Sequence, residues 1–444
     1  MIRLIINLNL FYLIYICELI KFTNNKYYYN LLYQRQFLQK CREASAKKNE
    51  FFSLLLKLYL DIESISFEYL VTFSKKLKLK DFKKIIKVFT QQNPEMSLQL
   101  LDRTRRKSDL AFIYRSFLFP SQSDESTLKN LLKKKPSLIF NLYNHYHYYN
   151  ASQAEKTLNQ YFNSNNLLPL TKVNENKPLY IDNIAIVSHI ESKKNYGQVS
   201  IIVSAKNEEL LIEGAIQSLI NQSYKNIEII FINDASSDKT LDVFINTCNK
   251  HKFKNFKTIN LDRNVGPFYC MNLGMQAAKG DFITFHGADD WAHPQRISAQ
   301  LNEIIKRNAM ASMSKLIRIK PTGELFSKHI YPLNRICVSS LLFKRQVIKD
   351  LGYFYTDLLG SDSEYPERIR LFYSARNLIV SPLVLTLAAH RNDSRTTCNK
   401  FGTANFGINK RRLLDLEILM ERLYDQFKFK KSYYVPFNKK QYSL

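Results

Sequence analysis

Residues 198–209, with the sequence QVSIIVSAKNEE, decide the fold of the second half of the chain. Val199–Val203 is a short apolar run rich in β-branched residues, which is typical of a buried strand. A polar turn follows the run and leads into the helical pattern Glu209–Ile220. An apolar strand that passes through a polar turn into a helix is the beginning of a βαβ unit.

The same order continues downstream. The apolar runs Ile227–Ile232, Phe256–Asn260 and Phe282–Phe285 alternate with the helical patterns Lys239–Cys248 and Pro267–Ala278. Strands separated by helices of this length predict an α/β fold with a mostly parallel sheet. Ligands bind outside the carboxyl ends of the strands in such sheets, so the polar residues at those ends are the candidate site.

Residues 1–195 are predicted to be α-helical, because Phe51–Tyr59, Phe82–Phe89 and Ser97–Leu101 carry apolar residues at spacings of three and four. The first glycine is Gly197 and proline is sparse, so no hairpin is expected in this region. The expected organisation is a helical region at 1–195, an α/β domain at 196–400 and a basic helical tail at 401–444.

The stretch Ile2–Ile20 is mostly apolar but contains Asn7, Asn9 and Glu18. No small-residue cleavage site follows it, so a removed signal peptide is not expected. A spanning helix needs about 20 predominantly apolar residues. We therefore expect a buried or interfacial helix, with a membrane span as the alternative.

The composition is that of a globular protein with a strong positive charge. Lys and Arg total 65 against 39 Asp and Glu, which gives a formal net charge of +26. This excess attracts phosphate on nucleic acid, anionic lipid or a nucleotide sugar, although AT-rich codons would produce a similar composition. The six cysteines form no CxxC pair and no zinc spacing, so free thiols in a reducing compartment are expected.

Carboxylates follow three of the predicted strands. Asp234 could accept hydrogen bonds from a base or a ribose, and Asp289 could ligate a divalent metal that neutralises a diphosphate. Asp, Ser and Asn at strand ends are also ordinary helix caps and turn formers, and Asp238 is expected to be such a cap. Three carboxylate-bearing ends facing one crevice favour the functional interpretation.

Several ordered segments resemble family 2 glycosyltransferases of the GT-A fold, of the bacterial surface-polysaccharide type. These segments are residues 198–209, 218–240, 264–266, 277–296, 339–354 and 360–371. The resemblance implies a Rossmann-like α/β transferase domain. It also implies inverting transfer of a sugar from a nucleotide-sugar donor, UDP-linked, to a glycan or lipid-linked acceptor. A Mn or Mg ion is the implied cofactor.

The resemblance also implies residue roles. The nucleotide-sugar pocket would be lined by Ser204, Ala205, Glu208, Asp234, Asn264, Gly266 and Asp289. The metal ligands would be Asp289, Asp290 and His390, although a structural role for His390 is an open alternative. The family's acidic motif is usually Asp-x-Asp, and Gly287 replaces its first carboxylate here.

Asp362 is the first candidate for the catalytic base and Glu364 is the second. Their alternatives are an N-cap for Asp362 and a helix-start residue for Glu364. His293 and Arg296 could face the diphosphate or the acceptor, or could simply belong to a helix start at Pro294.

Two other functions compete with transfer. The basic helical region would suit a nucleic-acid-binding protein, but no helix-turn-helix, RRM-like or zinc pattern accompanies the charge. A degenerate transferase domain that only binds is suggested by Gly287. The expected location is cytoplasmic, and the basic and aromatic tail with Lys430, Lys431, Tyr433 and Tyr434 fits peripheral contact with an anionic membrane.

Overall fold

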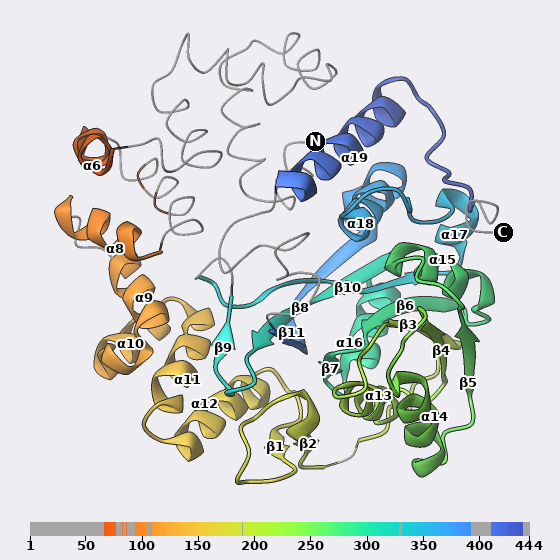
Figure 1. Cartoon of the computed structure of the whole chain (residues 1–444), viewed down its shortest axis with the longest axis horizontal. Helices are drawn as coiled ribbons and strands as arrows, with labels where there is room; N and C mark the ends of the chain where they lie inside the picture. Colours follow the sequence, from red (N-terminus) through yellow and green to blue (C-terminus); the bar gives the residue numbers. More distant parts are fainter. Residues whose placement is uncertain are drawn as a thin grey trace.

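The computed structural model describes residues 66–76, 82, 86, 94–104, 109–188, 190–327, 331–391 and 410–437. The predictions for Ile2–Ile20 and Phe51–Tyr59, and most of Phe82–Phe89, lie outside these residues. Within them, helices flank a nine-stranded sheet, and a group of helices earlier in the chain packs against one end of that sheet (Figure 1).

Four parallel neighbours form one part of the sheet, in the spatial order β5-β4-β3-β6. They are β3 (Val199–Ala205), β4 (Ile227–Asn233), β5 (Phe256–Asn260) and β6 (Phe282–Gly287). Every residue of β4 is buried, as expected for a strand covered on both faces. The register aligns Ala205 with Asn233 and Ser204 with Gly287, so the polar segments after β3, β4 and β6 emerge at one edge.

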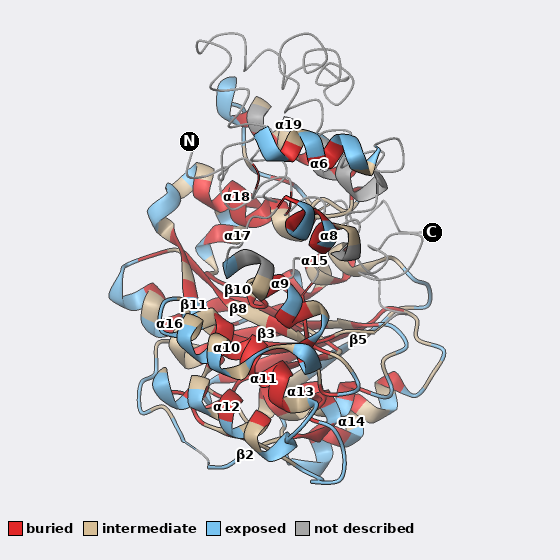
Figure 2. Ribbon diagram, turned by 90° about the vertical axis from the view of Figure 1, so that its left-hand side faces the viewer, coloured by how far each residue is buried: buried red, intermediate tan, exposed pale blue. Residues whose placement is uncertain are grey.

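Helices cover both faces of these strands, and buried residues run through the sheet between them (Figure 2). One face carries α13 (Ile212–Ile220), α14 (Thr240–Lys250) and α16 (Arg296–Lys306); the other carries α15 (Pro267–Ala277), α17 (Gln346–Leu351) and α18 (Ser361–Tyr373). Helix α15 lies especially close, because a Cβ at Gly274 would be only 2.4 Å from Ile202 Cγ2. The predicted α/β fold class is confirmed.

The rest of the sheet is mixed. Strand β10 (Arg335–Lys344) is antiparallel to β6 and to β8 (Ala311–Ile319). Strand β11 (Leu378–Ala389) runs parallel to β8, while β7 (Asp290–Ala292) and β9 (Leu325–Phe326) pair antiparallel with β11 and β8. The sequence prediction of a mostly parallel sheet did not specify these antiparallel pairs. Helix α19 (Lys410–Lys428) packs against α18.

The predicted helical region is also present. Its described helices of eight or more residues are α6 (Phe67–Lys76), α8 (Pro94–Arg103), α9 (Asp109–Leu118), α10 (Glu125–Leu132), α11 (Ile139–His147) and α12 (Ala151–Ser164). The expectation that it contains no hairpin is wrong, because β1 (Leu170–Lys172) and β2 (Ile184–Ile186) pair antiparallel. The connection between β1 and β2 has no glycine. The side-chain amide of Asn183 stabilises it by donating to the carbonyls of Asn174, Lys177 and Pro178.

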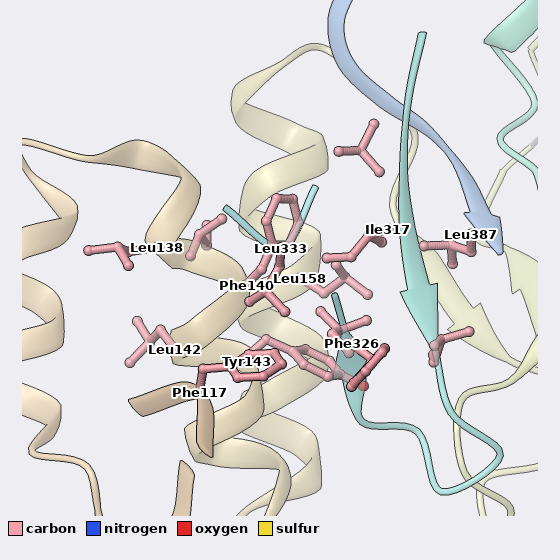
Figure 3. Close-up of a cluster of buried hydrophobic side chains, with 14 of the residues drawn as sticks. Phe117, Leu138, Phe140, Leu142, Tyr143, Leu158, Ile317, Phe326, Leu333 and Leu387 are labelled. Carbon is pink, nitrogen blue, oxygen red and sulfur yellow. The ribbon is translucent and has the colours of Figure 1, made fainter. Parts of the chain in front are cut away.

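The helical region and the sheet share one hydrophobic core (Figure 3). Phe140 and Leu158 of the helices lie in the same buried cluster as Ile317, Phe326 and Leu387 of the sheet. Polar contacts fix the same interface: Asn144 donates to the Leu325 carbonyl at 2.7 Å and accepts from its amide at 2.8 Å. The helices therefore pack against the part of the sheet that contains β8 and β11.

Candidate functional site

The carboxylate that follows β4 holds a loop in place. Asp234 is only 5% exposed, and its two oxygens accept hydrogen bonds from the amides of Val265 at 2.7 Å and Gly266 at 3.0 Å. Gly266 has a φ of 86° and directly precedes α15, and the side chain of Asn264 also accepts from its amide, at 3.1 Å. The structure thus brings together three residues predicted to surround the nucleotide, with Asp234 fixing the loop at the start of α15.

The segments after β3 and β4 are tied to each other. The carbonyl of Ala205 accepts from the amide of Asp234 at 2.9 Å. Asn207, which has a φ of 56°, donates its amide to Ser236 Oγ at 3.0 Å. The amide of Glu208 donates to Thr240 Oγ1 at 2.7 Å, which fixes the backbone beside its carboxylate.

An ion triad joins the segments that follow β3, β6 and β11. Arg391 directly follows β11, and its Nη2 lies 2.8 Å from each carboxylate oxygen of Glu208 and 3.4 Å from Asp289 Oδ2. The side chains of Arg391, Glu208 and Asp289 are 17%, 17% and 26% exposed, so they are partly buried yet reachable. The guanidinium therefore neutralises part of the negative charge that the strand ends bring together.

The other predicted metal ligands are engaged elsewhere. Asp290 is 9% exposed, and its Oδ1 accepts from the amide of Ala389 at 3.2 Å. Burial, and then the neighbouring charge of Asp289, raise the pKa of Asp290. The ring of His390 stacks on Phe326 with 4.1 Å between centroids.

The three residues that the resemblance implies as metal ligands therefore do not form one cluster. Within the ranges that the structure describes, no group of three or more His, Cys, Asp or Glu is arranged to hold a metal ion. Asp289, Asp290 and His390 each face a different partner: Arg391, the Ala389 amide and Phe326. At Gly287, a Cβ would lie 2.7 Å from Asp290 Oδ2 and 3.2 Å from Asp289 Oδ1, so both carboxylates border the space of the missing first carboxylate.

The two candidate bases occupy different environments. Asp362 lies in the first turn of α18, is partly exposed, and accepts from the Ser363 amide at 3.0 Å. Glu364 is fully buried, and its oxygens accept from Arg368 Nε at 2.8 Å and Nη2 at 2.7 Å.

Arg368 itself donates from Nη1 to the carbonyls of Leu351 and Tyr353, so this pair ties α18 to the end of α17. A carboxylate enclosed in this way is not placed to receive a proton from an acceptor. The structure thus corrects the choice of Glu364, and Asp362 stays the candidate.

A cavity of about 320 Å³ connects the loop to the segment that precedes Asp362. It is lined by Val265–Tyr269, by Thr356–Leu359 and by Asp415 of α19. Aromatic rings with nearby carboxylates are side chains suited to the apolar faces and hydroxyls of a sugar. The cavity links the predicted nucleotide side to the predicted base side of the cleft.

Residues 200–356, which contain most of these elements, match the family described as Glycosyl transferase family 2. The chain contains a family 2 glycosyltransferase domain. An uncharacterized glycosyltransferase of Haemophilus influenzae is 36% identical over 114 residues, which cover 26% of this chain and 45% of that relative. The matched region therefore spans less than half the length of this relative.

A second relative, from Escherichia coli, is named UDP-Glc:alpha-D-GlcNAc-diphosphoundecaprenol beta-1,3-glucosyltransferase WfaP. It is 29% identical over 170 residues, covering 36% of this chain and 65% of the relative. The S. aureus TarS fragment in complex with UDP-GlcNAc has a TM-score of 0.39 at 19% identity, over 53% of this chain and 71% of that one.

His293 and Arg296, which could have faced the diphosphate or the acceptor, are instead buried, so the alternative of a plain helix start describes them. His293 is 1% exposed; its Nε2 lies 3.0 Å from the Leu168 carbonyl, and burial lowers its pKa to about 4. Arg296 is fully buried and donates to the Phe285 carbonyl. The helical region covers His293, and no pattern local to residues 291–296 predicts that.

Sequence reasoning also missed the cation of the ion triad. Arg391 had no predicted role, although it directly follows His390 at the end of a predicted strand. Because polar residues at strand ends were the guiding signal for the other positions, the same signal applied to β11 would have found it.

Proposed function

We propose that the chain is an inverting glycosyltransferase that moves a sugar from a UDP-linked donor to a glycan or lipid-linked acceptor in bacterial surface polysaccharide synthesis. The observation that carries this proposal is the Asp234 carboxylate fixing the 265–266 loop at the start of α15. The start of a helix offers unpaired amides and a positive dipole end, which suit a diphosphate. The name of the E. coli relative supports UDP and a lipid-linked acceptor.

In this proposal Ser204, Ala205 and Glu208 lie on the nucleotide side of the cleft, and Asp362 lies on the acceptor side. Asp362 removes the proton of an acceptor hydroxyl while that oxygen bonds to the anomeric carbon. The bond from the same carbon to the diphosphate breaks on the opposite face, UDP leaves with the electron pair, and the configuration inverts. Alignment of donor and acceptor in the cleft provides much of the remaining acceleration.

Asp289 and Asp290 are the residues that would hold a divalent ion, since Asp289 Oδ1 and Asp290 Oδ2 lie 3.2 and 2.7 Å from the position of a Cβ at Gly287. Bound beside a diphosphate, such an ion would stabilise the charge of the leaving group.

A panel of nucleotides and nucleotide sugars tests the function. Thermal shift with UDP and GDP, followed by nucleotide release from UDP-glucose, UDP-N-acetylglucosamine and GDP-mannose, is expected to show stabilisation by UDP and turnover of a UDP-sugar. Binding without turnover of any donor, with or without a glycan or lipid acceptor fraction, would favour the degenerate binding module. Absence of binding by every nucleotide would overturn the proposal.

A specific surface feature supports a second property, contact with the cytoplasmic face of an anionic membrane. Phe427, Phe429 and Tyr434, near the end of α19 and beyond it, are 44%, 46% and 45% exposed. Lys428 and Lys431 lie over the Phe429 ring at 5.3 and 5.4 Å. Basic and aromatic side chains together suit the headgroup region. None of the helices in the described ranges has the length and apolarity needed to cross a bilayer.

A further inference from the structure

We propose that helix α19 forms the acceptor side of the cleft, and that Asp415 of this helix is a specificity-determining residue that binds a hydroxyl group of the acceptor sugar. The inference rests on the proposed function, because it concerns the acceptor that the same site would take. The feature that carries it is the cavity of about 320 Å³, to which α19 contributes Asp415.

The cavity has two walls that come from different parts of the chain. One wall is the loop and first turn of α15, Val265–Tyr269, whose first two amides are bound by Asp234. The other wall consists of Thr356–Leu359 and Asp415. The region that matches family 2 glycosyltransferases ends at residue 356, so it includes the first wall and stops where the second begins. The second wall is therefore the part of the cavity expected to suit this chain's own acceptor.

Two carboxylates fix α19 against the second wall. Asp415 is 3% exposed, and its Oδ2 accepts from the amide of Leu359 at 3.0 Å. Asp357 Oδ2 lies 2.8 Å from Nη2 of Arg422, which belongs to the same helix. Leu359 is three residues before Asp362 in the sequence. Asp415 is thus bound to the backbone segment that leads directly to the predicted base.

The chain beyond α19 returns to the first wall. The carbonyl of Val435 accepts from the amide of Tyr353 at 2.9 Å, and its amide donates to the carbonyl of Leu351 at 3.0 Å. The centroid of the Phe437 ring lies 5.0 Å from that of Tyr269. Figure 1 shows α19 beside α18 and the chain after it running to the region of α17. Helix α19 and the chain after it therefore contact both walls.

The side chains that line the cavity suit a single sugar unit. Phe268 and Tyr269 provide rings for the apolar face of a pyranose. The ionised carboxylates of Asp357 and Asp415 can only accept hydrogen bonds, so they select groups that donate, as sugar hydroxyls do. A volume of about 320 Å³ lies at the lower end of the range for small-molecule pockets, which favours one sugar unit over a longer glycan.

Initial rates of transfer to the octyl glycosides of glucose, galactose and N-acetylglucosamine test the inference, with the UDP-sugar that the nucleotide panel identifies. The parent protein is expected to use at least one of them. Asp415→Asn keeps an acceptor oxygen for the Leu359 amide but removes the charge. It is expected to raise the acceptor KM by about 10- to 100-fold, as loss of a charge-assisted hydrogen bond would. UDP affinity, donor hydrolysis without acceptor and urea unfolding should stay at parental values.

Removal of single hydroxyls from the accepted glycoside identifies the contact. One monodeoxy form is expected to have a raised KM with the parent and no further loss with Asp415→Ala, because the group that Asp415 binds is already absent. The same series with Asp415→Asn serves if the alanine variant does not fold. Asp425→Asn is the matched control, because Asp425 lies on the same helix, 3.9 Å from Lys431 Nζ, and does not line the cavity. It should keep the parental acceptor KM.

A parental acceptor KM in Asp415→Asn would overturn the inference, as would an equal loss of UDP affinity. A penalty that is the same for every deoxy acceptor would indicate a structural role for Asp415 and also overturn it. Donor hydrolysis by a parent protein that uses none of the glycosides would overturn the inference and leave the donor side of the proposed function standing. Absence of both UDP binding and donor turnover would overturn both.

Discussion

Replacement of Glu364 by Gln tests whether this carboxylate stabilises the fold or acts as the catalytic base. Glu364 and Arg368 have fully buried side chains, joined by hydrogen bonds of 2.8 and 2.7 Å. Glutamine keeps the shape but removes the charge and one acceptor, so Arg368 is left buried without its counter-charge. Breaking a buried pair on one side costs about 3–5 kcal/mol. For a chain of 444 residues, each kcal/mol lowers Tm by about 1 °C.

Urea unfolding followed by circular dichroism measures the free-energy loss, with Asp357→Asn as the control. Asp357 makes a similar carboxylate–guanidinium contact with Arg422, but those side chains are 47% and 34% exposed. That control is expected to cost no more than about 1 kcal/mol. If Glu364→Gln unfolds like the parent protein yet loses donor turnover, the structural assignment is refuted and Glu364 returns as the base.

Three further experiments test the loop held by Asp234, the packing of α15 and the contact with membrane. Asp234→Asn should destabilise the protein by about 1–3 kcal/mol and weaken UDP binding, because the asparagine side chain has one acceptor oxygen for two loop N–H groups. Urea unfolding and calorimetry measure the two effects, and parental values of both would contradict this prediction. Gly274→Val should cost at least about 1–3 kcal/mol in urea unfolding, since even its Cβ would lie 2.4 Å from Ile202 Cγ2; a neutral result would mean that α15 does not pack as described. Sedimentation with acidic vesicles should fall as salt rises, and more so for a Phe427→Ser/Phe429→Ser variant; salt-independent retention would contradict peripheral contact.

The strands and helices of the α/β half were predictable because their determinants are local. The apolar runs at Val199–Val203 and Ile227–Ile232 lie within the observed strands β3 and β4, and in-register parallel pairing then places their polar ends together. Asn264 and Gly266 were predicted to lie in a loop over the nucleotide and Asp234 to contact the base, and the structure places this loop against Asp234. Whether these residues bind a nucleotide stays a prediction.

The structure differs from the sequence-based predictions where residues distant in the chain contact the predicted side chain. Asp290 and His390 resemble metal ligands locally, but the Ala389 amide and the Phe326 ring engage them in the folded sheet. The ion pair of Glu364 could have been predicted from the sequence, since Arg368 lies four residues later on the same helix face. What the spacing did not show is that this face is fully buried against the end of α17.

If this domain transfers a sugar with Asp362 as its base, Asp362→Asn should lose turnover and keep its fold. Donor turnover and UDP affinity are measured for Asp362→Asn beside the parent, using the UDP-sugar that the panel identifies. Because the side chain is partly exposed and asparagine retains its acceptor toward the Ser363 amide, unfolding and UDP affinity should stay at parental values. Turnover should fall by about 10²–10⁴-fold, the usual effect of removing a general base. Turnover that stays near the parental rate would contradict the account and place the base elsewhere in the cleft.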